Sequence, residues 1–208
     1  MIWRDPPLPI PDRASTGSGP TATGPAPTGT VPPGRLDVST RVATIGAASL
    51  TLPEDPYVIY PDPLSIEQVF DQLFWASTTV HPSYDGRRDW SATVFLGQVS
   101  KPLDPPDLQA QGQQTMTQLS RTIFDRHGTT LKGLDSSDRS VDGHPGLLFT
   151  ARVTYSVSHL PSKYDTLQAL IVRLDDGSVV VAGTSVPNDT DPSTARLALM
   201  ALDTLHVG

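Results

Sequence analysis

The sequence predicts an α+β fold in which helices pack on a largely antiparallel sheet. Helical and strand-like segments both occur, but they do not alternate strictly, which disfavours a doubly wound parallel sheet. The last third of the chain is mostly strand-like and carries turn signals at residues 142–143 and 175–177. A chain of 208 residues is long enough for one ordinary domain and a tail.

Residues 1–36 carry an excess of proline and glycine and show no hydrophobic periodicity. The stretch "GPTATGPAPTGTVPPG" (19–34) contains no side chain larger than valine. Prolines remove backbone donors and favour extended conformations, so we expect a disordered linker here and a globular domain over residues 37–208. A flexible coil of this length spans about 35 Å, which would hold the domain clear of whatever precedes the linker.

The first folded elements are predicted to be a strand or hairpin over residues 41–52 and an amphipathic helix over residues 62–77. Asp62 and Pro63 would be the N-cap and the first helical residue. The apolar residues at helical spacing are Ile66, Val69, Phe70, Leu73 and Phe74.

A strand over residues 89–100 and a second helix over residues 106–127 are predicted to follow. The alternating residues that predict one buried strand face are Trp90, Ala92, Val94 and Leu96. The residues on one stripe of the helix are Met116, Leu119 and Ile123. Gly128 supplies the C-terminal stop of the helix.

The remaining elements are predicted to be three neighbouring strands and a closing helix. The longest strand covers residues 146–157, and the segment around residues 175–177 folds back on itself. Asp191 and Pro192 would begin the last helix as cap and first helical residue. Its apolar residues are Leu197, Leu199, Leu202 and Leu205.

Composition excludes several classes of function. The net charge of -7 argues against nucleic acid as a partner, because binding to phosphates requires a clustered basic surface. The chain has no cysteine, which excludes disulfides and thiolate chemistry. No apolar run is long enough to span a bilayer. The opening "MIWRDPPLPIPDR" is typical of a chain that has just left a membrane, so we expect a membrane anchor or signal upstream of Met1; a frayed terminus is the alternative.

The sequence contains no recognisable catalytic motif and predicts neither an enzyme nor a cofactor. It lacks a Gly-x-Ser-x-Gly elbow, a phosphate-binding glycine-rich loop with lysine, and a His-Glu-x-x-His motif. Five histidines occur in different segments, so no metal site is predicted from their spacing. They are His81, His127, His144, His159 and His206.

The best candidate for recognition is the segment "TTVHPSYDGRRDW", residues 78–90. Arginine, tyrosine and tryptophan dominate binding hot spots because they combine apolar area with hydrogen bonding. The candidate binding residues are His81, Tyr84, Arg87, Arg88 and Trp90. The alternative interpretation is a solvated turn at residues 84–86 with Trp90 in the core.

Two segments carry patterns for glycosylation. Residues 188–190, "NDT", match the acceptor pattern for N-linked sugars, which also occurs by chance. The linker is rich in threonine and proline, and we hypothesise that it carries O-linked sugars.

Several stretches together resemble the actinobacterial cell-envelope branch of the PsbP/Mog-type fold. They are "ASLTLPED" (48–55), "VDGHPGLLFTARVTY" (141–155) and "LIVRLDDGSVVVAGTSVP" (170–187), followed by the closing helix. The branch includes LpqN-type lipoproteins, Ala/Pro-rich secreted glycoproteins and the trehalose monomycolate transport factor. The chain departs from the pattern in reading Glu54 and Asp55 after Leu-Pro where relatives have Gly-Trp, and in lacking a lipobox cysteine.

The resemblance, which covers residues 40–207, implies an α-β-α sandwich and a non-enzymatic adaptor of the cell envelope. The implied partner is a membrane protein complex, such as a lipid transporter, or a mycolate glycolipid, with attachment through an upstream anchor and the exported side favoured. One alternative is a secreted recognition protein that binds surface or host glycoproteins. The other is an enzyme with an unrecognised site.

Overall fold

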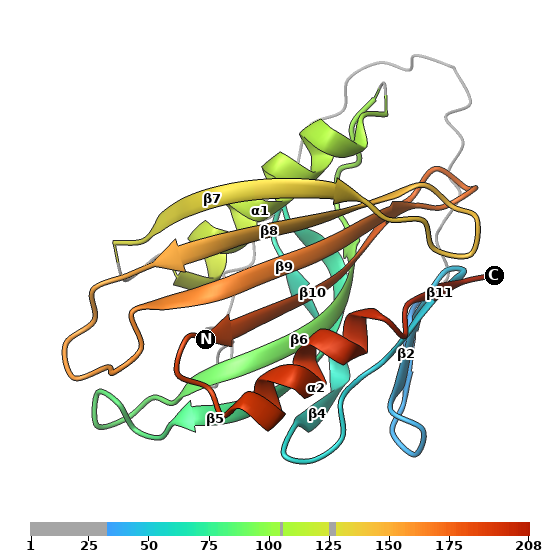
Figure 1. Cartoon of the computed structure of the whole chain (residues 1–208). Helices are drawn as coiled ribbons and strands as arrows, with labels where there is room; N and C mark the ends of the chain where they lie inside the picture. Colours follow the sequence, from blue (N-terminus) through green and yellow to red (C-terminus); the bar gives the residue numbers. More distant parts are fainter. Residues whose placement is uncertain (1–32, 105, 125–127) are drawn as a thin grey trace, which may run out of the picture.

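A seven-stranded antiparallel sheet forms the centre of the protein (Figure 1). This computed structural model describes residues 33–104, 106–124 and 128–208. The strand order is β4-β5-β6-β10-β9-β8-β7. The strands are β4 (Val58–Ile66), β5 (Phe70–His81), β6 (Trp90–Val99), β7 (Thr130–Asp138), β8 (Gly146–Thr154), β9 (Tyr164–Arg173) and β10 (Val179–Pro187).

A smaller four-stranded sheet has the order β1-β2-β3-β11 and joins the two ends of the described chain. Its strands are β1 (Arg35–Asp37), β2 (Val42–Ile45), β3 (Ala48–Thr51) and β11 (His206–Val207). The two helices are α1 (Leu108–Phe124) and α2 (Pro192–Leu202). They lie on opposite faces of the large sheet (Figure 1).

The large sheet is buried on both faces, and each face has its own hydrophobic core. One core is formed with α2 and the small sheet and includes Leu50, Val94 and Leu202. The other is formed with α1 and is rich in aromatic residues, among them Trp90 and Phe149. Strands with two buried faces lose the simple alternation of apolar and polar residues.

The expected α-β-α sandwich is wrong, because the described chain contains far more strand than helix and a second sheet covers one face of the large sheet together with α2. The largest single error is the helix predicted over residues 62–77. This segment forms the end of β4, a turn, and most of β5. Because β5 is buried on both faces, its apolar residues fall on consecutive positions as well as at helical spacing. Pro61 and Pro63 lie in β4, an edge strand, where a missing backbone donor is tolerated.

Other predicted elements are confirmed with shifted bounds. The hairpin over residues 41–52 is the pair β2 and β3, and the strand over 89–100 is β6. The helix over 106–127 begins at Leu108 in α1, and the closing helix is α2, with Asp191 as its cap. The predicted linker over residues 1–36 falls largely outside the described residues, and β1 begins at Arg35.

The prediction of a single buried face for β6 is wrong. Ala92, Val94 and Leu96 face the core formed with α2, but Trp90 belongs to the opposite, aromatic core. A register shift between Thr79 and His81 of β5 lies opposite Ser91 and Trp90, at the point where the alternation of β6 breaks.

Candidate functional site

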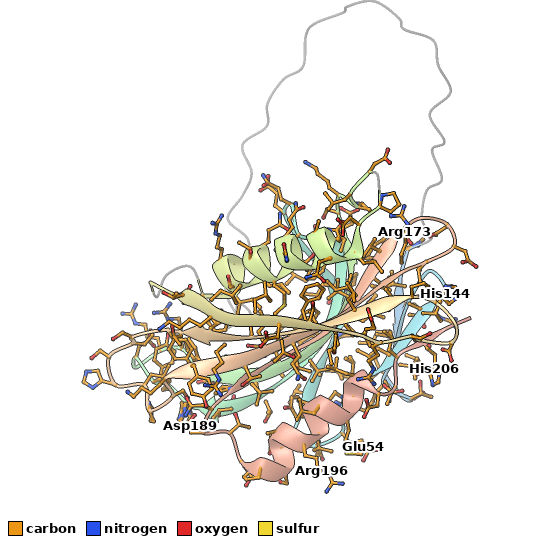
Figure 2. The ribbon with its side chains drawn as sticks, turned by 45° about the horizontal axis from the view of Figure 1, so that its top comes forward. Glu54, His144, Arg173, Asp189, Arg196 and His206 are labelled. Carbon is orange, nitrogen blue, oxygen red and sulfur yellow. The ribbon has the colours of Figure 1, made fainter. Side chains whose placement is uncertain are left out.

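Three connections meet at one end of the large sheet, which we call the loop end. They are the β5–β6 loop (residues 82–89), the β8–β9 loop (residues 155–163) and the β10–α2 connection (residues 188–191). The β5–β6 and β8–β9 loops lie side by side at the left of Figure 1. The C-terminal strand β11 lies at the other end, and Figure 2 likewise separates Asp189 from His206.

The β5–β6 loop is held in one conformation by Asp85. Its Oδ1 accepts hydrogen bonds from the backbone N–H groups of Arg88 (2.8 Å) and Arg87 (3.1 Å). Its Oδ2 accepts from Arg88 Nε at 2.6 Å and lies 2.5 Å from Arg88 Nη2. The backbone N–H of Arg88 contributes most to holding the pKa of Asp85 below its ordinary value. Gly86 has a φ of 83°, a conformation that glycine adopts without steric cost.

Aromatic packing joins this loop to the core. Tyr84 meets Trp90 edge to face, with 5.5 Å between ring centroids, and the guanidinium of Arg88 lies 5.8 Å from the Tyr84 centroid. Trp90 is 1% exposed and packs against Tyr155 with a centroid distance of 4.6 Å. The β5–β6 loop therefore rests on a rigid aromatic base.

A buried carboxylate, Asp165 of β9, lies beneath the same aromatic residues. Its Oδ1 accepts from Tyr155 Oη at 2.5 Å and from Trp90 Nε1 at 3.2 Å, and its Oδ2 accepts from Ser185 Oγ at 2.8 Å. Burial raises the pKa of Asp165, and the three donors oppose this only in part. The carboxylate is 2% exposed, so it supports the loops rather than contacting a ligand.

His81, Ser162 and Asp189 form a polar cluster that joins all three connections. His81 Nε2 lies 2.8 Å from Ser162 Oγ and 3.0 Å from Asp189 Oδ2, and the Ser162 hydroxyl donates to Asp189 Oδ1. Because the single hydroxyl proton points to Asp189, Nε2 must itself carry a proton and act as the donor. Partial burial would raise the pKa of Asp189, but the bonds from Ser162 and His81 outweigh it and lower the pKa.

This cluster has the composition of a catalytic triad but lacks its geometry. A general base needs an unprotonated ring nitrogen toward the serine, with the carboxylate on the other nitrogen. Here Asp189 and Ser162 share one nitrogen of His81, and Ser162 is 1% exposed. The arrangement joins the three connections and does not activate a nucleophile.

An open groove of about 580 Å³ separates the β5–β6 loop from the β8–β9 loop. Its lining residues are Tyr84, Asp85, Gly86, Arg88, Val157, Ser158 and His159. Most of them are polar, and Val157 is the only aliphatic residue in the lining. The exposed area of the lining is nevertheless more apolar than polar, so the groove offers a ligand both apolar contact and polar groups.

The structure places the five predicted binding residues in different environments. Arg87 and Arg88 are exposed, His81 is partly buried in the polar cluster, and Tyr84 and Trp90 are buried. Trp90 occupies the core, as the alternative interpretation expects. Participation of these residues in binding stays a prediction.

The sequence did not identify the residues contributed by the other two connections. Ser162 and Asp189 are separated from His81 by about eighty residues or more, and no local pattern links them. The one available signal was Asp165, an acidic residue near the start of a strand whose second half carries the apolar run 169–172. Asn188, of the "NDT" pattern, accepts hydrogen bonds from the backbone N–H groups of Lys163 (2.7 Å) and Tyr164 (3.1 Å), which gives it a structural role.

The opposite end of the sheet carries a second set of histidines. His206 Nδ1 lies 3.3 Å from Asp142, and His144 Nδ1 lies 3.6 Å from Asp175. Among the residues that the structure describes, no group of three or more histidine and acidic side chains could hold a metal ion. His127 lies outside the described residues.

Neither described helix combines the length and apolar character needed to cross a bilayer. Comparison with protein-family models and with curated proteins found no match. The solution structure of cyanobacterial PsbP (CyanoP) from Synechocystis sp. PCC 6803 is similar, with a TM-score of 0.50 at 13% identity. The match covers 91% of this chain and 100% of CyanoP.

The crystal structure of the Saccharomyces cerevisiae Ran-binding protein Mog1p gives a TM-score of 0.47 at 14% identity, over 78% of this chain and 90% of Mog1p. The likeness to CyanoP supports a fold of the PsbP type, in line with the fold that the sequence resemblance implies. At these identities the likeness concerns the fold alone.

Proposed function

We propose that this protein is a non-enzymatic binding module that engages a protein partner at the loop end of its large sheet. The observation that carries the proposal is the groove between the β5–β6 and β8–β9 loops, whose walls are fixed before any partner binds. Asp85 orders one wall, and Ser162 ties the other to His81. Preorganised walls favour affinity, because little conformational entropy is lost on binding.

The position of the groove relative to the chain ends supports a tethered module. The backbone N–H of Gly34 donates to Gln72 near the start of β5, whereas the groove lies beyond the other end of that strand. The nine residue-to-residue steps from Gln72 to His81 span about 30 Å. Any attachment preceding Gly34 therefore enters the domain at the end away from the groove.

We propose more specifically that the protein is an exported adaptor of the cell envelope that is held by an upstream anchor. In this role it would be an accessory factor in mycolate glycolipid export. It rests on the sequence resemblance and on the proline-rich composition of residues 1–36. Val157 is the one aliphatic residue among the lining residues of the groove, which therefore offers an acyl chain no continuous aliphatic surface and favours a protein component of such a complex over the glycolipid itself. Membrane fractionation of the native host tests the location: recovery of the protein only from the cytosol would overturn it.

Site-specific photocrosslinking in the native host tests the binding site. The crosslinker p-benzoylphenylalanine replaces Ser158 in the groove or, as a matched control, Asp175 at the opposite end, whose side chain is 95% exposed. We expect a discrete protein adduct from position 158 and none from position 175. Equal adducts from both positions, or none from position 158, would contradict the proposal.

The same photocrosslinking experiment distinguishes the envelope adaptor from a second candidate function, that of a secreted recognition protein. This candidate is favoured by the threonine-rich and proline-rich linker, which offers sites for O-linked sugars. It predicts adducts only with surface or host glycoproteins and hexose increments in the intact mass. Adducts with a membrane complex from unglycosylated protein would exclude it.

A further inference from the structure

An apolar strip follows one face of β4, an edge strand of the large sheet. Tyr60 and Ile66 pack against the aromatic core, on the face that carries α1. Val58 shares this face because it precedes Tyr60 by two residues in a regular pairing, and Leu64 shares it because it is paired with Leu73 of that core. We call these four residues, Val58, Tyr60, Leu64 and Ile66, the β4 strip.

The β4 strip is partly open to solvent. The helix on this face, α1, packs on β7, β8 and β9, in the other half of the sheet (Figure 1). Val58 is 58% exposed and Leu64 is 37% exposed, so the strip holds two of the five exposed large hydrophobic residues in the described part of the chain. The ring of Tyr60 stacks on Trp75 with 3.8 Å between centroids. The strip thus combines exposed aliphatic groups with a fixed aromatic pair.

The edge strand β4 is poorly suited to pairing with a further strand. Pro61 and Pro63 have no backbone N–H to donate, and register shifts interrupt the pairing of β4 with β5 between Tyr60 and Ile66. A segment in the polyproline conformation needs no backbone ladder, and such segments dock on aromatic-lined surfaces. The β4 strip therefore favours a proline-rich occupant over an added strand.

The chain itself contains a proline-rich apolar segment within reach of the strip. Residues 6–11 read "PPLPIP", and residues 12–33 connect them to Gly34. A flexible coil of that length reaches about 25 Å. Gly34 is bound to Gln72, and Trp75 lies three residues further along β5, about 10 Å away. Moreover, β1, which follows Gly34, contacts β4.

We propose that residues 6–11 dock on the β4 strip of the same chain, where Leu8, Ile10 and the neighbouring prolines cover its exposed side chains. This contact is independent of the proposed function, because the strip shares no residue with the groove. A short tether raises the effective concentration to the millimolar range, so a contact too weak to form between separate chains is populated within one chain. Docking closes residues 12–33 into a loop and thereby shortens the reach of the predicted linker.

Paramagnetic relaxation in the ¹⁵N-labelled full chain tests this contact. A nitroxide is attached at Asp12→Cys, which is the only cysteine of that variant. We expect broadening of the amide signals of Val58, Tyr60 and Leu64, and none for Lys132 in β7, at the other edge of the sheet.

Two pairs of substitutions identify the side chains that make the contact. Leu8→Ser with Ile10→Ser leaves the domain over residues 37–208 unchanged and should abolish the broadening. Val58→Ser with Leu64→Ser should abolish it as well.

The matched control lies on the other exposed aliphatic pair of the described chain. Leu199 and Met200 of α2 are 46% and 51% exposed, and Leu199→Ser with Met200→Ser should leave the broadening as in the parent. The inference is overturned if Leu8→Ser with Ile10→Ser leaves the signals of the β4 strip as broad as in the parent. Loss of broadening in the α2 control equal to that in the β4 variant also contradicts it.

A mixture of chains identifies the occupant. Nitroxide-labelled chains without ¹⁵N are mixed with ¹⁵N-labelled chains that carry no nitroxide. We expect no broadening in this mixture. Broadening of the strip signals as strong as within one chain would assign the strip to a second copy and reject docking within the chain.

Discussion

Asp165 is the residue on which the loop end depends most. It receives donors from Trp90, which supports Tyr84 and the β5–β6 loop, and from Tyr155, which begins the β8–β9 loop. Burial and the nearby Asp165 charge raise the pKa of Tyr155, so its hydroxyl remains a donor over the physiological range. One buried carboxylate thus fixes the bases of both groove walls.

Substitution of Asp165 should therefore have opposite effects for alanine and asparagine. Asp165→Ala removes the acceptor of three donors, Trp90, Tyr155 and Ser185, and should lower the free energy of unfolding by about 3 kcal/mol. Asp165→Asn keeps an oxygen for Trp90 and Tyr155 and places its amide toward the Ser185 hydroxyl, which can turn to accept. We expect its stability at pH 7 to equal or exceed that of the parent in urea denaturation. An equal loss for both variants would contradict this account.

The difference in stability between Asp165→Asn and the parent should depend on pH, because the pKa of Asp165 is raised in the folded protein. A carboxyl with a pKa above its unfolded value binds its proton more tightly in the folded state. Its contribution to stability is fully present below the unfolded pKa and is lost as the pH rises through the folded pKa. The stability of Asp165→Asn relative to the parent should therefore increase as the pH is raised from about 3.5 to 7. A pH-independent difference would mean that the carboxyl does not titrate in the folded protein over this range.

At the scale of elements, the turn between β4 and β5 shows why the predicted helix is wrong. Gln68 has a φ of 65°, which interrupts any helix and reverses the chain. The spacing from Ile66 to Phe74 is shared by a helix and by a strand buried on both faces. The local signal for a strand was Trp75 together with the β-branched residues Thr78, Thr79 and Val80, in the part of β5 that continues to His81.

At this turn, substitution by glycine should stabilise the protein, whereas in a helix glycine would destabilise it. Gln68→Gly should raise the free energy of unfolding by about 0.5–1 kcal/mol, because glycine adopts a positive φ without a Cβ clash. Glu67→Gly, one residue earlier and not at positive φ, is the matched control and should lower stability. Thermal unfolding of both variants provides the measurement, and a gain for Glu67→Gly would argue against the observed turn.

The packing of α1 on the large sheet depends on Gly112. A Cβ at this position would lie 2.0 Å from the ring of Phe149, closer than two carbon atoms can approach. Alanine gains about 1 kcal/mol in helix propensity over glycine, whereas overpacking of a core costs about 1–3 kcal/mol. Because the overlap involves three ring atoms of Phe149, the overpacking cost should prevail.

Gly112→Ala is therefore expected to destabilise the protein by about 1–2 kcal/mol in urea denaturation. Gln113→Ala, on the exposed side of α1, should change stability by less than about 0.5 kcal/mol. Combining Gly112→Ala with Phe149→Leu should recover part of the loss, since the smaller side chain relieves the overlap. Stabilisation by Gly112→Ala alone would show that α1 does not sit on Phe149.

At the scale of the whole molecule, both ends of the described chain lie away from the groove. Gly34 is bound to Gln72 near the start of β5, and the backbone N–H of Gly208 donates to the Ala47 carbonyl in the turn between β2 and β3. Figure 2 shows His144 and His206 together at this end, with Asp189 at the other. Attachment at either end of the described chain would leave the loop end accessible.

Spin-label distances test this arrangement directly, because the chain has no native cysteine. Labels at Ser158→Cys and Asp175→Cys should be separated by about 30 Å or more, the length of β9. Labels at Asp175→Cys and His206→Cys, both at the opposite end, should be closer than the first pair. A shorter distance for the first pair than for the second would invalidate the separation of groove and tether.

The sequence by itself determined the local features of this protein. Turn residues, caps and short-range periodicity predicted the β2–β3 hairpin, β6, the two helices and the β9–β10 turn, because these depend on neighbours in the chain. The prediction of a recognition loop rests on the same kind of local pattern, since its five candidate residues are nearly contiguous, and it stays a prediction. The lack of catalytic motifs also follows from composition and spacing alone.

Only the tertiary structure decided which segments pair and which side chains meet. Burial of β5 on both faces, the second sheet, and the joining of His81 to Ser162 and Asp189 all arise from contacts between residues far apart in sequence. Contacts of this kind produce no periodic pattern in the sequence. A strand buried on both faces only has to be apolar and extended, so its sequence does not specify which strand lies beside it. Local sequence patterns were therefore sufficient to predict turns, caps and most elements. The groove could not be predicted in this way, because it forms only when loops far apart in sequence are brought to the same end of the sheet.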